Sequence, residues 1–274
     1  MIFLTFPPLL RHSSKSGAYV PAQTEDTPGL TRFTLRDAFV ALTILILVFG
    51  FILIGSRDAD KRVAESNIRT CMRNVDSALK RYAELHGGSL PERELRDAQG
   101  KSLSSWRFEV FPHSRHLWDP QTYGIDYRLD LPWEAKANQS IANCRPLYFC
   151  ADRARRSTTN VFAVTGTDTA FHDGNVSNIA KLPSVLIVAA EVNHSNTHWM
   201  QPGDYDVGEL LTAKGRLGDQ MKGILTDRVY VLFVNGEVWA LSPDTPMTAI
   251  HPFLTITGAK NADRDELLAT WRVN

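Results

Sequence analysis

The feature that most constrains this chain is an uncharged apolar run from Ala38 to Ile54, AFVALTILILVFGFILI. Thr43 is the single polar side chain in these seventeen residues. At 1.5 Å per residue, and extended by Leu35 and Gly55, the run approaches the roughly 20 residues with which a helix crosses a bilayer. A buried core helix is the alternative, but a soluble core rarely needs so long a run. We therefore expect a transmembrane helix over residues 32–56, preceded by a leader over residues 1–31.

Beyond Arg57 the apolar residues keep to one side of the expected helix. They fall at i, i+4, i+7, i+11 and i+14, which is the spacing of a single helical face, and they are Ile68, Met72, Val75, Leu79 and Tyr82. No proline interrupts this stretch, and the pair Gly87-Gly88 followed by Pro91 is typical of a helix end. The pattern predicts an amphipathic stalk helix over residues 57–88 that lays one face on a folded domain.

Residues 89–274 have the pattern of one α+β domain. Strand-like runs at 106–111, 146–150, 160–165, 184–191, 229–234 and 237–241 lie between loops, without regular βα alternation. The pair Asn235-Gly236 between the last two runs is the strongest short hairpin signal. We expect an antiparallel sheet packed on the stalk helix, and a short terminal helix within 263–272.

The charge balance and the cysteines exclude some classes of protein. Thirty basic and thirty acidic residues give a formal net charge of zero, which offers no bulk attraction for nucleic acid. Three cysteines are too few for a disulfide-dense scaffold or a four-cysteine zinc site. One disulfide is compatible with the sequence, between Cys144 and Cys150 or from either of them to Cys71; buried thiols are the alternative.

Two groups of polar residues are candidates for metal binding. Glu191, His194, His198 and Asp204 carry the imidazole and carboxylate groups that transition metals prefer. Asp168 and Asp173 lie in an oxygen-rich stretch of the kind that binds calcium, but without the alternation of an EF-hand. Solvated polar loops are the alternative for both groups.

The sequence contains no nucleophile elbow, P-loop or dinucleotide fingerprint, so we predict that the protein is not an enzyme and has no cofactor. A metal-dependent hydrolase at Glu191, His194, His198 and Asp204 is the alternative to a protein without enzymatic activity.

Several aromatic residues are candidates for lining a carbohydrate or peptide groove, with core packing as the alternative. They are Trp106, Trp118, Trp133, Trp199 and Tyr205.

The entry to the first helix resembles the processing site of type IV prepilins and type II secretion pseudopilins. Phe33-Thr34-Leu35 matches that site, Asp37 stands where the family has glutamate, and Arg32 stands where it has glycine. The resemblance implies that a prepilin peptidase cuts before Phe33 and methylates the new amine, and that the acid at position 37 helps to dock the subunit. A purely local reading is that Thr34 and Asp37 form a capping box at the helix start.

Motifs further along the chain resemble, in the same order, those of pilin-like exported proteins of planctomycetes. They are Thr70-Cys71-Met72-Arg73-Asn74, Gly88-Ser89-Leu90-Pro91, Ser105-Trp106-Arg107, Tyr148-Phe149-Cys150 and Thr159 to Phe171. The family usually has a histidine where this chain has Leu225. The resemblance implies a pilin-like fold, an anchor in the inner (cytoplasmic) membrane and an extracytoplasmic domain. Its implied partners are the membrane, other pilin-like subunits, a secretion assembly platform and the prepilin peptidase.

We therefore expect a membrane-anchored, pilin-like structural or interaction protein that packs its apolar helix against those of other subunits. The alternative is an anchored module that does not polymerise and binds a solute or glycan through loops between residues 166 and 206.

Overall fold

The computed structural model describes residues 34–113, 128–143, 149, 151, 157–172, 177–193 and 195–273. The chain divides into two units, residues 1–52 and 53–274, which are described separately. The described residues of the first unit form the first part of helix α1 (Leu35–Leu85). The helix begins after Thr34 and ends before the positive-φ pair Gly87 and Gly88, as the glycine signal predicts.

The second unit is an α+β domain built on a five-stranded sheet with the order β5-β3-β4-β6-β7. The strands are β3 (Val161–Thr165), β4 (Ile187–Glu191), β5 (Tyr205–Asp206), β6 (Val229–Phe233) and β7 (Val238–Leu241). Neighbours are antiparallel except β3 and β5, which pair in parallel with Val164 opposite Tyr205. A separate two-stranded sheet joins β1 (Glu94–Arg96) to β2 (Ser102–Ser105).

The hairpin between β6 and β7 follows the local sequence. Gly236 has φ +87° and donates its N–H to Phe233 O at 2.9 Å, which closes the turn after Asn235. The predicted hairpin is confirmed.

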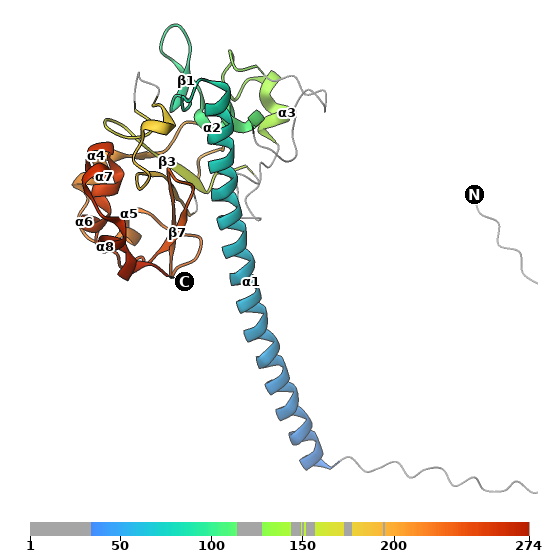
Figure 1. Cartoon of the computed structure of the whole chain (residues 1–274). Helices are drawn as coiled ribbons and strands as arrows, with labels where there is room; N and C mark the ends of the chain where they lie inside the picture. The colour runs from blue at the N-terminus through green and yellow to red at the C-terminus, as the bar shows by residue number, and fades with distance from the viewer. Residues whose placement is uncertain are drawn as a thin grey trace, which may run out of the picture. The chain divides into compact units, whose positions relative to one another are not determined.

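Both faces of this sheet are buried, because successive side chains of a strand point to opposite faces. In β6, Tyr230 and Leu232 join a core that contains the buried face of α1, and Val229, Val231 and Phe233 join a second core. All five predicted residues of the α1 stripe, Ile68 to Tyr82, are buried. In Figure 1 the sheet lies between α1 on one side and a group of short helices on the other.

The short helices complete the domain. They are α2 (Trp106–Val110), α3 (Gln139–Ala142), α4 (Val207–Thr212), α5 (Leu217–Gln220), α6 (Met247–Ile250), α7 (Ile256–Asn261) and α8 (Arg264–Leu268). The 3-10 turns are Phe111–His113, Lys136–Asn138, Ile179–Lys181, His251–Leu254 and Ala269–Trp271. The terminal helix expected within 263–272 corresponds to α8 and the 3-10 turn that follows it.

The fold expected from the sequence needs three corrections. Within the part of the chain that the structure describes, no helix is both long and apolar enough to cross a membrane. The predicted pilin-like fold, in which a transmembrane helix over residues 32–56 continues into an amphipathic helix, is therefore wrong. The sheet is mixed rather than antiparallel, because β5 joins β3 in parallel. The run 106–111, expected as a strand, forms α2 instead: Ser105 keeps an extended backbone and the helical turns after it bury Trp106, Arg107, Phe108 and Val110.

Candidate functional site

The start of α1 carries the capping box that the sequence predicts. Asp37 N donates to Thr34 Oγ1 at 3.3 Å, and the Asp37 carboxylate accepts from Thr34 N at 3.0 Å and Thr34 Oγ1 at 2.7 Å. The hydroxyl and backbone bonds from Thr34 lower the pKa of Asp37. These bonds satisfy free N–H groups at the helix start. The processing residues Arg32 and Phe33 lie outside the described residues.

Several predicted site residues also lie outside the described residues: Cys144, Cys150, Asp173 and His194, together with Trp118 of the aromatic group. The disulfide therefore stays a prediction. Cys71, the third cysteine, is buried in the core that contains α1.

Asp168 is the calcium candidate that lies within the described residues, and it binds backbone groups of the C-terminal region. Its backbone has φ +62°, and its carbonyl accepts from Ile256 N at 2.7 Å. Its carboxylate accepts from Thr257 N at 3.0 Å, next to the start of α7. Asp168 thus fixes the loop after β3 to the C-terminal helices.

His198 uses both ring nitrogens inside the protein. Met200 N donates to Nδ1 at 3.2 Å, so the proton lies on Nε2, which donates to Ala142 O at 3.1 Å. Trp133 stacks on the imidazole with a centroid distance of 4.5 Å. Burial lowers the pKa of His198. Neither nitrogen presents a lone pair to a metal, so this histidine is a structural group.

Glu191, at the end of β4, is fully buried and holds a loop. Its Oε1 accepts from Ile224 N at 2.6 Å and its Oε2 accepts from Tyr230 N at 3.2 Å. Gly223 permits this close approach, because a Cβ there would lie 3.0 Å from Glu191 Oε2 and 2.1 Å from Arg228 O. Burial raises the pKa of Glu191 to about 7, against the lowering effect of the two N–H bonds.

Asp204 and Arg107 form the most elaborate polar cluster of the described domain. Arg107 comes from α2 and is fully buried, and Asp204 precedes β5 with 6% of its side chain exposed. The Arg107 Nη1 to Asp204 Oδ1 distance is 2.7 Å. The ring faces of Trp106 and Phe162 lie 5.3 and 5.8 Å from the guanidinium carbon. The low dielectric of these surroundings strengthens the ion pair.

The remaining guanidinium donors of Arg107 bind backbone carbonyls. Nη1 also donates to Val161 O at 3.3 Å, and the other acceptors are Trp199 O at 3.0 Å, Gln201 O at 2.9 Å and Gly203 O at 3.0 Å. All five donors of this guanidinium are therefore used. The cluster ties α2 to β3 and to the segment 199–204.

Asp204 Oδ1 accepts two further hydrogen bonds, from Trp106 Nε1 at 3.1 Å and from Ala163 N at 2.8 Å. Among the described residues, no hydrogen bond reaches the second carboxylate oxygen, Oδ2. Burial raises the pKa of Asp204, while the charge of Arg107 lowers it.

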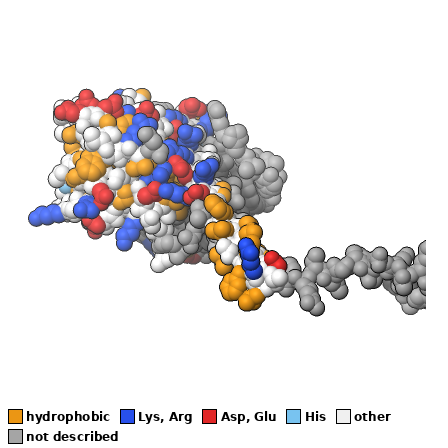
Figure 2. Space-filling view, turned by 90° about the horizontal axis from the view of Figure 1, so that it is seen from below, with side chains coloured by type: hydrophobic (Ala, Val, Ile, Leu, Met, Phe, Trp, Pro, Cys, Tyr) orange, Lys and Arg blue, Asp and Glu red, His pale blue; other side chains and the backbone are white. Residues whose placement is uncertain are grey.

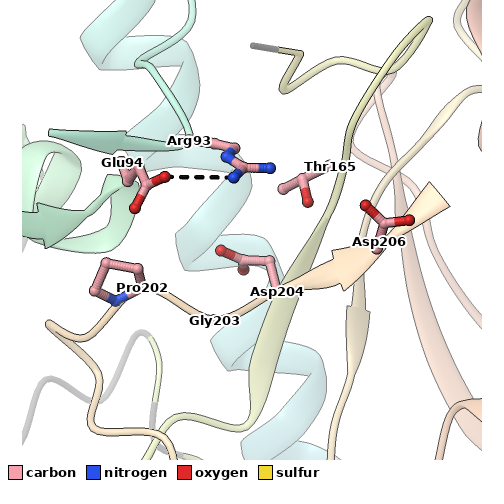
Figure 3. A pocket seen from close by; sticks show the side chains of 7 residues that line it. All are labelled: Arg93, Glu94, Thr165, Pro202, Gly203, Asp204 and Asp206. Atoms are coloured by element: carbon pink, nitrogen blue, oxygen red, sulfur yellow. Dashed lines mark hydrogen bonds and ion pairs between the residues drawn. The ribbon is translucent and has the colours of Figure 1, made fainter. Parts of the chain in front are cut away.

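A cavity of about 170 Å³ adjoins this cluster. Figure 3 shows its walls: Arg93 and Glu94 at β1 lie across from Asp204, with Thr165 of β3 and Asp206 on one side and Pro202 on the other. Thr165 Oγ1 donates to Tyr205 O at 3.1 Å, which leaves its lone pairs as acceptors.

The structure does not bring the predicted metal ligands together. Among the described residues there is no group of three His, Cys, Asp or Glu side chains that could hold a metal ion. Asp204 is engaged by Arg107 and His198 by two backbone groups. Arg107 is the site residue that is not predicted from the sequence, although a lone arginine inside the apolar run W-R-F signals a buried cation that needs a carboxylate partner.

Comparisons of this chain with protein-family models, with curated proteins and with solved structures found no match.

Proposed function

We propose that the protein is a non-enzymatic structural or interaction protein that assembles with further copies of itself through the apolar segment, residues 35–51 of α1. One observation carries this proposal: eleven large apolar side chains of the segment are each 49–77% exposed. They are Leu35, Phe39, Val40, Leu42, Ile44, Leu45, Ile46, Leu47, Val48, Phe49 and Phe51. Figure 2 shows hydrophobic side chains gathered at this end of α1.

The arrangement of these side chains supports assembly with more than one neighbour. At 3.6 residues per turn, the eleven positions point in all directions around the helix axis. One partner helix covers one face, so a simple dimer would leave the other faces in water. A helix that is apolar all round is stable when apolar groups surround it. The same segment of several other copies supplies such surroundings at matching length.

The energy available from this burial is large. Full burial of a leucine, isoleucine, valine or phenylalanine side chain contributes about 1.5–3 kcal/mol. The eleven side chains are roughly half exposed, so covering them would contribute on the order of 10 kcal/mol per chain. The other exposed large apolar side chains are scattered along the described chain, and they are Val63, Leu85, Leu129, Leu211 and Leu267.

The polar end of the segment is compatible with close packing. The Asp37 carboxylate is already bound by Thr34, so its charge is partly compensated within its own chain. In the assembly we propose that Asp37 is the one acidic group near the packed helices. The resemblance to prepilins and pseudopilins implies that Asp37 helps to dock the subunit. It also implies that a prepilin peptidase cuts before Phe33, that a secretion assembly platform is a partner, and that the protein is located at the inner membrane.

The test is the mass of the full-length protein after detergent removal, measured by light scattering and sedimentation velocity. Leu45→Lys, at a side chain 62% exposed, places a charge within the segment. The matched control is Leu85→Lys, the same change on the same helix at a side chain 54% exposed. We expect wild type and Leu85→Lys to form assemblies of many copies, and Leu45→Lys to remain monomeric.

Two results would overturn this proposal. A wild-type chain that stays monomeric in aqueous buffer would show that the segment does not drive assembly. A chain that floats with phosphatidylglycerol vesicles as a monomer would identify lipid as the surroundings of the segment.

A further inference from the structure

The cavity beside the Arg107–Asp204 cluster has the properties of a small-ligand site, and nothing in the assembly proposal uses it. A volume of about 170 Å³ is more than ten times the ~10–15 Å³ that one water molecule needs. It is smaller than the roughly 300 Å³ at which sites for drug-sized ligands begin. The cavity therefore suits a ligand of a single small ring.

The atom that points most directly to a ligand is Asp204 Oδ2. The Asp204 side chain is 94% buried and lines the cavity, and its three hydrogen bonds all reach Oδ1. A buried carboxylate oxygen is strongly stabilised by a hydrogen-bond donor. Thr165 Oγ1 and the Asp206 carboxylate add further acceptors on the same side, and the latter binds Glu209 N through Oδ1. A ligand in this cavity is thus expected to donate several hydrogen bonds.

Two of the three carboxylates that line the cavity are paired with arginine. Arg93 and Arg96 both contact Glu94, and Arg107 contacts Asp204. The lining itself holds the carboxylates of Glu94, Asp204 and Asp206 and the guanidinium of Arg93, because Arg96 and Arg107 contact their carboxylates from outside the lining. A carboxylate that is already paired with arginine attracts a free cation only weakly. Such a lining favours a neutral ligand whose groups both donate and accept hydrogen bonds, which is the property of a hydroxyl.

We propose that this cavity binds one residue of a neutral polyol, such as a monosaccharide unit. Ligand hydroxyls donate to Asp204 Oδ2, Thr165 Oγ1 and Asp206, and a ligand oxygen accepts from the guanidinium of Arg93 across the cavity. Pro202 supplies an apolar wall for the carbon atoms of the ring.

Saturation-transfer NMR on the full-length chain tests this proposal. The probes are D-glucose, D-galactose, D-mannose and N-acetyl-D-glucosamine, with ethylammonium chloride and sodium acetate as charged competitors, all at pH 7. We expect at least one sugar to bind with a Kd in the millimolar range, as its size allows, and neither charged probe to bind.

Two variants alter the walls without touching the Arg107–Asp204 pair. Arg93→Met removes the guanidinium and Thr165→Val removes the hydroxyl, and each should weaken sugar binding at least tenfold. The matched control is Arg216→Met, at a side chain that is 66% exposed and does not line the cavity, and this variant should bind as wild type does. Circular dichroism confirms that each variant is folded.

Three results would overturn the proposal: no sugar in the panel binds the folded protein, ethylammonium or acetate binds instead, or both wall variants bind the sugar as wild type does. The measurement is separable from the assembly proposal, because Leu45→Lys should bind the same sugar with the same affinity whether or not wild type assembles.

Discussion

Asp204 and Glu191 are two buried acidic side chains of the same domain that are stabilised in different ways. Asp204 faces a buried guanidinium at 2.7 Å and accepts two further hydrogen bonds on the same oxygen. Glu191 has no ion-pair partner among the described residues and accepts one backbone N–H on each oxygen. Asp204 immediately precedes β5 and Glu191 is the last residue of β4, but only Asp204 has an opposite charge beside it in the described part of the chain.

This difference indicates how each region responds to perturbation. A buried ion pair is strongly destabilised when one partner is removed, because an uncompensated charge remains. A buried carboxylate without a cation takes up a proton instead, so its response appears in the pH dependence of stability. The Arg107–Asp204 cluster should therefore be sensitive to mutation, and the Glu191 loop should be sensitive to pH.

The largest effect is expected for Arg107→Leu. The change leaves Asp204 buried without its cation and removes the donors bound to Trp199 O and Gly203 O. We expect the free energy of unfolding to fall by about 3–5 kcal/mol, measured by urea denaturation at pH 7.

The control for this variant is Arg216→Leu, which removes an ion pair with Asp244 in which both side chains are 66% exposed. Its effect should stay within about 0.5 kcal/mol. If both arginine variants cost the same, the buried pair would have no special role in stability.

The second effect is the pH dependence set by Glu191. Its pKa is about 7 in the folded chain against an ordinary value of 4.5, so the folded state holds the proton more tightly than the unfolded state. Its contribution to stability is full below pH 4.5 and is lost as the pH rises to about 7. The loss amounts to about 3 kcal/mol.

Glu191→Gln should remove this decline, because an amide does not titrate. The comparison is the difference in unfolding free energy between pH 4.5 and pH 7.5, measured in both proteins, so that other titrating groups cancel. An equal decline in wild type and variant would show that folding does not raise the pKa of Glu191.

The parts of this fold that sequence could predict are those set by neighbouring residues. The Asn235-Gly236 hairpin, the buried stripe from Ile68 to Tyr82 and the helix end at Gly87 all follow from local spacing. The parallel pairing of β5 with β3 could not be predicted, because it depends on contacts between segments about 40 residues apart.

The candidate site was predicted less well for a similar physical reason. By residue type and spacing, Asp204 belongs with the nearby acids and histidines, but its main partner is Arg107, 97 residues earlier. His198 looked like a ligand by residue type, and its two backbone bonds become visible only when Met200 and Ala142 are placed around it. Motifs formed by neighbouring residues could be predicted from the sequence, whereas an ion pair between residues far apart in the sequence could not.

A smaller effect is expected for Trp106→Phe. The change keeps an aromatic ring in the core but removes the bond from Nε1 to Asp204 Oδ1. We expect a loss of about 1–2 kcal/mol in unfolding free energy, because the acceptor is charged. Trp199→Phe is the matched control: that indole is equally buried, but its bond to Ala142 O is 3.4 Å long and neutral. A larger loss at Trp199 would contradict the importance of the charged acceptor.

The smallest effect, about 1 kcal/mol, is expected for Tyr205→Phe. The Tyr205 hydroxyl donates to the backbone carbonyl of Glu191 at 2.8 Å and not to its carboxylate. Loss of this bond should therefore lower the unfolding free energy equally at pH 4.5 and pH 7.5, and the decline caused by Glu191 should persist. Denaturation of wild type and variant at the two pH values checks this. A loss that changes with pH would mean that the hydroxyl stabilises one protonation state of the Glu191 carboxyl group. That result would contradict the expectation that Tyr205 acts only through the backbone carbonyl of Glu191.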